Sequence, residues 1–267
     1  MCIRDSRRAG CHLAGGQEVA RYVPMCTIAI YSMKGGVGKT TLAVNLAWSA
    51  ATLSSRRTLL WDLDQQAAAT YLVQTGKKPK RRAEGVYDQE VKPRKLIRKT
   101  NIERLDLLAA DSSLRDLDRM FFSFGKKKRL LKIIDSVARD YDRVILDCPP
   151  GLSETSDQIL RAADIVLVPV IPSPLSERAF DTVVDHIQRN HKGRTAILPV
   201  FTMVDRRRNL HKAALEREKR WPVIPYASAI EQMAAHRKPV GAFAPNSPAG
   251  KAFAKLWRGV ERKISKL

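Results

Sequence analysis

The sequence predicts an α/β fold in which helices cover both faces of a mostly parallel, twisted sheet of about seven to eight strands. Short apolar runs alternate with segments of helical periodicity, which is the pattern of a wound parallel sheet. The runs are almost continuously apolar, as strands covered on both faces should be. A glycine-rich turn follows the first run and precedes the first helical segment. Turns at this place in such folds form cradles for anions.

The predicted elements follow one another without an internal repeat or an interdomain linker. At 267 residues, the chain can bury one α/β core and has little left for a second domain. The apolar runs predict strands at residues 27–32, 58–63, 105–109, 143–147, 165–171, 195–201 and 223–225. Helical patterns predict helices at residues 40–53, 128–139, 154–162, 176–189, 210–220 and 249–265. Residues 77–99 are basic, contain prolines and are weakly apolar, so we predict a surface excursion there.

The N-terminal 24 residues stand apart from this pattern. They lack the apolar stretch of a secretory signal. Residues 1–6 match the translated end of a transposon used to prepare sequencing libraries, so we predict that residues 1–24 are a non-native or disordered leader. Met25 stands just ahead of the first predicted strand, and we expect residues 25–267 to form the single domain.

Residues 34–41 read Lys-Gly-Gly-Val-Gly-Lys-Thr-Thr and form the most informative motif. In a strand–loop–helix context, the loop amides and the helix N-terminus point at a phosphate group. Lys39 is expected to reach the β- and γ-phosphates of a nucleotide, and the Thr40 hydroxyl to ligate Mg²⁺. Glycines are needed because a Cβ would block the backbone from the phosphates or forbid the required φ. The predicted phosphate site consists of Gly35, Gly36, Val37, Gly38, Lys39, Thr40 and Thr41.

Two acidic segments end predicted strands and complete this site. Asp147 closes one strand and is followed by Cys-Pro-Pro-Gly, which is the Walker B position, where the carboxylate holds Mg²⁺. Asp62 and Asp64 close another strand. Two acids this close repel each other, and a nearby Mg²⁺ would offset the repulsion. We therefore predict that Thr40 and Asp147 hold the metal.

The glycine loop departs from the usual GxxxxGK[ST] pattern, because Met33 replaces the first glycine and Lys34 precedes the glycine pair. Together with Asp-Leu-Asp-Gln-Gln at 62–66 and Asp-Cys-Pro-Pro-Gly at 147–151, this resembles the deviant loop of the ParA/MinD family of ATPases. The resemblance covers residues 25–267. It implies a P-loop NTPase domain that hydrolyses ATP with Mg²⁺ and forms a homodimer with ATP. Lys34, Lys39 and Asp64 are the implied catalytic residues.

The resemblance also assigns roles to single residues. By this resemblance, Lys34 crosses the dimer interface to the partner's nucleotide, and Asp64 orients the hydrolytic water. Asp62 lies near the metal, so the resemblance adds Asp62 to the predicted metal residues. The family has a proline where this chain has Gln65. The segment that begins at Thr202 resembles the one that meets adenine, although many relatives have asparagine there. Pro225 and Tyr226 are expected on the other side of the purine.

The formal net charge is +21, from 48 Lys and Arg against 27 Asp and Glu, which points to a polyanionic partner. DNA and an anionic membrane surface are the two candidates, and a merely soluble basic protein is the third possibility. ParA-type relatives bind DNA non-specifically in the ATP state and release it after hydrolysis stimulated by a ParB-like or other activating protein. The implied location is the cytoplasm, on the nucleoid. The candidate phosphate contacts are Arg206, Arg207, Arg208, Lys212, Arg237, Lys238, Arg258 and Arg262.

The C-terminal segment keeps a MinD-like alternative open. Its apolar residues fall on one helical face with lysines and arginines on others, which suits an interfacial membrane helix. The pattern also suits a final helix that packs on the sheet, and we favour that interpretation, so a membrane partner is not expected. The apolar face consists of Phe253, Leu256, Trp257, Val260, Ile264 and Leu267. Cluster-bridged relatives such as the nitrogenase iron protein need a cysteine pattern that this chain lacks.

Overall fold

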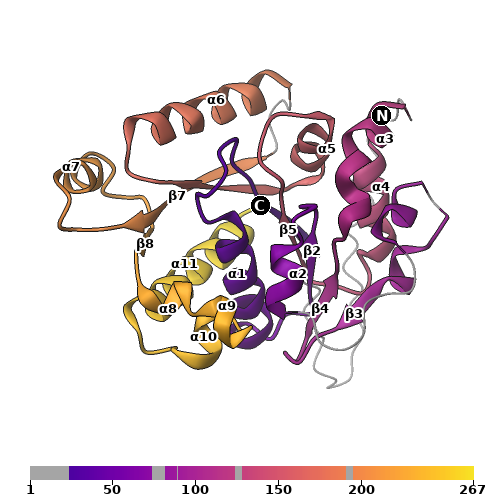
Figure 1. Cartoon of the computed structure of the whole chain (residues 1–267), viewed down its shortest axis with the longest axis horizontal. Coiled ribbons are helices and arrows are strands. Elements are labelled where there is room, and N and C mark those ends of the chain that lie inside the picture. Colours follow the sequence, from indigo (N-terminus) through magenta and orange to yellow (C-terminus); the bar gives the residue numbers. More distant parts are fainter. Residues whose placement is uncertain (1–23, 74–81, 89, 124–127, 191–194) are drawn as a thin grey trace, which may run out of the picture.

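The computed structural model describes residues 24–73, 82–88, 90–123, 128–190 and 195–267. Apart from Pro24, the predicted leader lies outside these residues. The described chain forms one eight-stranded sheet in the order β3-β4-β2-β5-β1-β6-β7-β8. All neighbouring strands are parallel except β3, which runs antiparallel to β4. The predicted α/β fold is confirmed (Figure 1).

The strands and helices alternate along the chain much as predicted. The strands are β1 (Cys26–Ile30), β2 (Thr58–Asp62), β3 (Ile97–Lys99), β4 (Leu105–Leu108), β5 (Arg143–Asp147), β6 (Ile165–Val170), β7 (Ala196–Val204) and β8 (Val223–Pro225). The helices of the first half are α1 (Lys39–Leu53), α2 (Ala68–Val73), α3 (Leu117–Ser123), α4 (Arg129–Val137) and α5 (Glu154–Ala162). Those of the second half are α6 (Pro174–Asn190), α7 (Asn209–Arg217), α8 (Ser228–Glu231), α9 (Met233–His236), α10 (Val240–Phe243) and α11 (Pro248–Ile264).

The sheet separates two hydrophobic cores. Along β1, Ile28 and Ile30 face one core, while Ala29 and Tyr31 face the other, because successive side chains of a strand point to opposite sides. Helices α1, α2 and α11 cover the first face, and α3, α4, α5 and α6 cover the second (Figure 1). Burial on both faces explains why the strands read as continuous apolar runs.

The apolar face of α11 is buried against the sheet. Ser247 caps the helix by accepting a hydrogen bond from the Gly250 amide, and Pro248 occupies its first turn. Trp257 is fully buried and its Nε1 donates to Ser54 Oγ at 2.8 Å. Of the six apolar residues predicted on this face, Leu267 alone is exposed. The packed alternative is therefore the one that the structure adopts, and no helix among the described residues is long and apolar enough to cross a bilayer.

The prediction of a surface excursion over residues 77–99 is wrong for the part that the structure describes. Tyr87 is buried, and its hydroxyl accepts a 3.0 Å hydrogen bond from Trp61 Nε1. Val86, Val91 and Leu96 join the same core, and β3 extends the sheet by one antiparallel strand. A few large apolar side chains attach this segment to the core. They are too few among the charged residues to form a recognisable periodic pattern in the sequence. Residues 77–81 and 89 lie outside the described residues.

A buried ion pair joins α11 to the first residue of the central strand β5. Arg143, in β5, is 1% exposed, and its Nε and Nη2 each donate to a Glu261 carboxylate oxygen at 2.9 Å. Because Glu261→Ala leaves this guanidinium buried and unpaired, we expect a loss of about 3–5 kcal/mol in the free energy of unfolding. Chemical denaturation measures it. Glu103→Ala, which removes an exposed 3.6 Å pair with Arg104, is the matched control and should change stability by less than about 0.5 kcal/mol. Equal effects of the two variants would contradict the prediction.

Candidate functional site

The sheet order places the three functional segments beside one another. Strand β5 lies between β2 and β1, and its last residue, Asp147, is in register with Asp62 on one side and Ile30 on the other. The carboxyl ends of these parallel strands therefore meet at one edge of the sheet, which is where open α/β sheets bind ligands. The glycine loop follows β1 at that edge and leads into α1.

The glycine loop encloses open space. Gly36 (φ 72°) and Gly38 (φ 91°) adopt left-handed conformations that favour glycine. A Cβ built at Gly35, Gly36 or Gly38 would meet no atom within 4 Å. Gly38 is also the residue from which α1 begins, so the unpaired amides of the first helical turn face the same region. Left-handed glycines ahead of a helix N-terminus are what a phosphate cradle needs, so this geometry is compatible with the predicted phosphate site.

The two lysines of the motif have different environments. Lys39 is 7% exposed, and its Nζ donates to the backbone carbonyl of Lys34 at 2.9 Å. Burial lowers the pKa of Lys39, while the charges of Asp147, Cys148 and Asp64 act in the opposite direction. The side chain of Lys34 is half-exposed. Lys39 thus closes the loop from inside, whereas the Lys34 side chain is accessible to another molecule.

Asp147 is a buried carboxylate without a partner. Neither of its oxygens has a hydrogen-bond partner among the described residues. Burial raises its pKa well above the ordinary value, and the charges of Asp62 and Asp64 raise it further, while the neighbouring Thr40 hydroxyl and the positive charge of Lys39 lower it. An uncompensated buried carboxylate is costly, so this position calls for a cation.

Mg²⁺ fits this position. It prefers oxygen ligands and is commonly held by one or two protein side chains together with phosphates and water. Thr40 and Asp147 are the side chains that would hold it, and the ion would neutralise charge on the phosphates. The described residues contain no group of three or more His, Cys, Asp and Glu side chains arranged to bind a metal.

Asp62 has a different role from Asp147 in this structure. Its oxygens accept hydrogen bonds from the Asp64 amide at 3.1 Å and from the amide and hydroxyl of Thr70, both at 2.8 Å. Burial raises its pKa to about 6, and the hydrogen bonds from Thr70 act against the rise. Both oxygens are therefore in use. Asp62, predicted as a metal residue, fixes the turn that carries Asp64 and the start of α2.

The turn after Asp62 forms with Gln65 at the position where the family resemblance led us to expect proline. The Ala67 amide donates to the Asp64 carbonyl at 2.8 Å, and Asp64 Oδ1 accepts from the Gln66 amide at 2.9 Å. Ala67 takes up a left-handed conformation (φ 53°). Asp64 itself is half-exposed at the edge of the site, where a water molecule can approach it.

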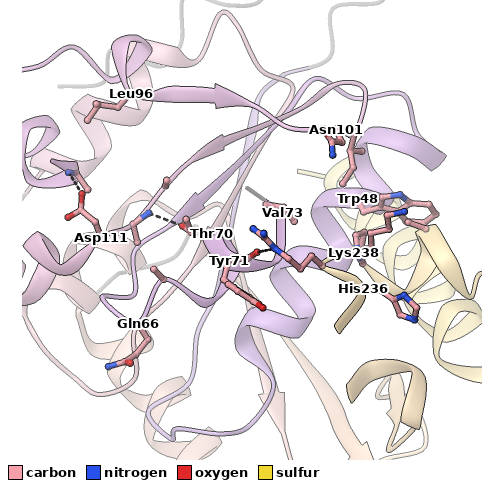
Figure 2. Close-up of a pocket in the computed structure, with 18 of the residues that line it drawn as sticks. Trp48, Gln66, Thr70, Tyr71, Val73, Leu96, Asn101, Asp111, His236 and Lys238 are labelled. Atoms are coloured by element: carbon pink, nitrogen blue, oxygen red, sulfur yellow. Dashed lines mark hydrogen bonds between the residues drawn. The ribbon is translucent and has the colours of Figure 1, made fainter. Parts of the chain in front are cut away.

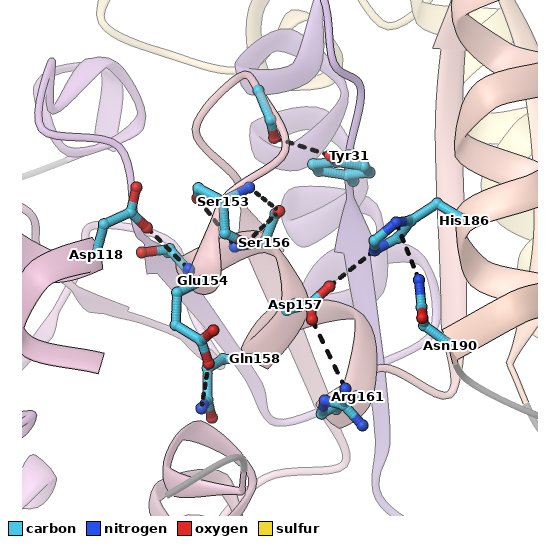
Figure 3. A network of polar contacts seen from close by, with 12 residues as sticks. Tyr31, Asp118, Ser153, Glu154, Ser156, Asp157, Gln158, Arg161, His186 and Asn190 are labelled. Atoms are coloured by element: carbon cyan, nitrogen blue, oxygen red, sulfur yellow. Dashed lines mark hydrogen bonds and ion pairs between the residues drawn. The ribbon is translucent and has the colours of Figure 1, made fainter. Parts of the chain in front are cut away.

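A polar network that sequence patterns did not predict supports the segment after Asp147. The Tyr31 hydroxyl donates to the Gly151 carbonyl at 2.8 Å, and the Gly151 amide donates to the Met33 carbonyl at 3.2 Å. Ser153 and Ser156 form a reciprocal cap at the start of α5. Figure 3 shows this cap beside Asp157, whose carboxylate lies 2.7 Å from His186 of α6. The Ser-x-x-Ser spacing resembles a capping box and was the available sequence signal.

The structure places the residues predicted around adenine in different environments. Thr202 is buried, and its hydroxyl donates to the Val37 carbonyl at 2.9 Å, so it holds the glycine loop from β7. Pro225 ends β8. Tyr226 is 60% exposed, and its amide donates to Val204. The Thr202 hydroxyl is thus used by the protein, whereas Tyr226 is exposed, and the contact of Tyr226 with a base stays a prediction.

The eight basic residues predicted to contact DNA are exposed and fall into three groups. The first lies at the start of α7, where Arg207 forms a 2.9 Å ion pair with Asp205. The second is the turn between α9 and α10, and the third is the outer surface of α11. The members are Arg206, Arg207, Arg208 and Lys212 in the first group, Arg237 and Lys238 in the second, and Arg258 and Arg262 in the third.

Comparison with known proteins gives consistent matches. Residues 25–198 match the model of a family described as an AAA domain. The chain is 29% identical over 248 residues to the sporulation initiation inhibitor protein Soj of Bacillus subtilis, covering 87% of this chain and 97% of Soj. It is 27% identical over 254 residues to the chromosome partitioning protein ParA of Caulobacter vibrioides, covering 89% and 94% of the two chains.

A solved structure extends the comparison to three dimensions. The cobyrinic acid a,c-diamide synthase of Mycobacterium smegmatis, solved with a bound ATP analogue and magnesium, superposes with a TM-score of 0.75 at 25% identity. The match covers 89% of this chain and 94% of that one.

Proposed function

Since the chain belongs to the ParA/MinD family of P-loop ATPases, we propose that it is an ATP-dependent switch that dimerises with ATP, binds DNA non-specifically and hydrolyses ATP. ATP and Mg²⁺ are its nucleotide and metal. The observation that carries the proposal is the unpartnered Asp147 carboxylate, which lies in register with Asp62 beside the glycine loop.

The geometry supports hydrolysis by positioning and electrostatics, which supply most of the catalysis in phosphoryl transfer. The loop amides and Lys39 bind the phosphates, and Asp147 with Thr40 would hold the metal. Asp64, half-exposed on a turn that Asp62 fixes, orients the attacking water. Lys34 is available to reach the nucleotide of a second subunit, which makes hydrolysis depend on dimerisation.

The proposal for the cellular role rests on the net charge of the chain and on its family membership. A net charge of +21 and three exposed basic groups favour a polyanion on the surface. We propose that the partner is DNA, that the protein acts in the cytoplasm on the nucleoid, and that a ParB-like or other protein stimulates hydrolysis to partition or position a cargo. A MinD-like membrane role is not favoured, because the apolar face of α11 is used by the core.

Asp64→Ala tests the proposed cycle. Without the residue that orients water, hydrolysis should fall about 10²-fold, while ATP binding and dimerisation persist. The protein should then remain as an ATP-bound dimer on DNA, measured by size-exclusion chromatography and co-sedimentation with duplex DNA. Asp116→Ala, which removes another exposed acid, should cycle normally. A monomeric Asp64→Ala protein in saturating ATP would contradict the mechanism.

A further inference from the structure

A large cleft lies beside the nucleotide site. Its volume is about 1370 Å³, which exceeds the roughly 300–1,000 Å³ of typical small-molecule pockets and suits a segment of a polymer. Figure 2 shows Thr70 and Tyr71 of α2 on one side and His236 and Lys238 on the other. Trp48 of α1 lies beside Lys238.

Two basic side chains, Arg237 and Lys238, line one wall of this cleft. His236, Arg237 and Lys238 are all exposed, whereas Asp111 is the one acidic residue that lines the cleft among the described residues. Such a surface attracts an extended anion. Of the three groups of basic residues predicted to contact DNA, the one at the turn between α9 and α10 lines this cleft.

One chain of contacts joins this turn to the nucleotide site through α2. The Asp62 carboxylate accepts both hydrogen bonds from Thr70. The next residue, Tyr71, is 55% exposed, and its carbonyl accepts a 3.0 Å hydrogen bond from Arg237 Nε. The Arg237 guanidinium also stacks over the Tyr71 ring, 4.9 Å from its centre. These contacts connect Asp62 to Arg237 through two adjacent residues of α2.

A second chain of contacts runs through α1. Asn45 lies one turn after the glycine loop, and its amide donates to the Thr41 carbonyl at 2.8 Å and contacts Met233 Sδ at 3.2 Å. Its Oδ1 accepts from the Val240 amide at 2.8 Å. The α9–α10 segment is thus held by both helices that begin at the nucleotide site.

The backbone of the turn supports a functional role. Arg237 ends α9 in a left-handed conformation (φ 48°), which is uncommon for a residue other than glycine and carries strain. That conformation is compatible with both of its contacts to Tyr71. The left-handed backbone of Arg237 and its two contacts with Tyr71 indicate that this turn has a fixed conformation.

We propose that the cleft between α2 and the α9–α10 turn is the surface that receives the DNA phosphate backbone, and that the contact between Tyr71 and Arg237 makes this binding depend on the bound nucleotide. The inference rests on the proposed function and assigns the DNA contact to one of the three groups of basic residues, the one at the α9–α10 turn. Asp62 and Thr41 lie on the nucleotide side of these contacts, and Arg237 and Lys238 present the charge.

The test compares binding of a short labelled duplex by the full chain loaded with a non-hydrolysable ATP analogue or with ADP, at one fixed salt concentration. Tyr71→Ala should lower the ratio of the two affinities about two- to fivefold, the effect of an exposed cation–π contact. Tyr71→Phe keeps the ring and should keep the ratio. Lys238→Ala should weaken binding to all sequences and reduce the salt slope by about one, whereas Lys255→Ala, at an exposed lysine of α11 outside the predicted contacts, should have little effect.

The outcomes separate the two levels of the proposal. An unchanged affinity ratio in Tyr71→Ala, or a loss of binding in Lys255→Ala but not in Lys238→Ala, overturns the cleft and leaves the proposed function intact. Displacement of the duplex by polyglutamate as effectively as by unlabelled duplex would indicate an acidic polypeptide and overturn the assignment to DNA. A wild-type protein that binds no duplex in either state would refute the proposed function itself.

Discussion

Lys34→Ala is expected to bind ATP almost normally and to lose dimer-dependent hydrolysis. The position supports the glycine loop through its backbone, because the Lys34 carbonyl accepts the hydrogen bond from Lys39 Nζ, and alanine keeps that carbonyl. The half-exposed ammonium is therefore free to act on a second subunit. A cation supplied in trans to the transferred phosphate is worth about 10³–10⁵-fold in rate. Lys39→Ala, in contrast, should impair ATP binding as well.

The measurement is the ATPase rate as a function of protein concentration, with nucleotide binding followed by a fluorescent ATP analogue. A mixture of Lys34→Ala with Asp64→Ala provides the decisive control. In the mixed dimer, the Lys34→Ala subunit keeps Asp64 and receives Lys34 from its partner, so part of the activity should return. Normal turnover by Lys34→Ala alone, or no recovery in the mixture, would contradict a role in trans.

The nucleotide site was predictable because its determinants are local. The glycine loop, Lys39 and Asp147 each follow a buried strand directly, and parallel strands bring their carboxyl ends to one edge. The strand order that makes Asp147 the neighbour of both Asp62 and Ile30 is set by the whole fold, yet the prediction needed only that the strands share an edge. Short-range patterns were sufficient for this part.

The remainder depended on contacts between distant residues. Tyr87 is buried because Trp61 and Phe121 surround it, and its charged sequence neighbours conceal this. The Thr202 hydroxyl meets Val37 across 165 positions, so the adenine role suggested by resemblance could not be separated from a loop-holding role. Helices α8, α9 and α10 have four residues each and are too short for periodicity to reveal.

The C-terminal helix shows where periodicity alone is ambiguous. An amphipathic helix has the same pattern whether its apolar side meets lipid or a sheet. In α11, the decision comes from tertiary partners: Trp257 bonds to Ser54, and Glu261 pairs with the buried Arg143. These polar contacts fix the helix in a way that a lipid surface would not reproduce.

Asp147→Asn is expected to raise the thermal stability of the nucleotide-free protein and to lower its ATPase activity. Removing a buried, unpartnered charge should raise the midpoint of thermal unfolding of the nucleotide-free protein. Hydrolysis should fall on the order of 10³-fold, comparable to losing a preorganised electrostatic group. The variant should also lose most of the stabilisation by Mg²⁺ and ATP, which is about 2.7 kcal/mol at a hundredfold excess over Kd for a competent site. Thermal unfolding with and without Mg²⁺ and ATP, together with the ATPase rate, measures all three.

The pH dependence of stability provides an independent check on Asp147. Its pKa in the folded protein lies well above the ordinary value of 3.8, so the folded state keeps a proton that the unfolded state has released. The wild-type protein should therefore lose stability as the pH rises from about 3.8 through the raised pKa, and the pKa of Asp62, raised to about 6, acts in the same direction. Asp147→Asn should flatten this slope, while Asp116→Asn at an exposed site should leave it unchanged. An Asp147→Asn protein that is less stable than the wild type without nucleotide would show that the carboxylate is already compensated, and the case for a cation at this position would fail.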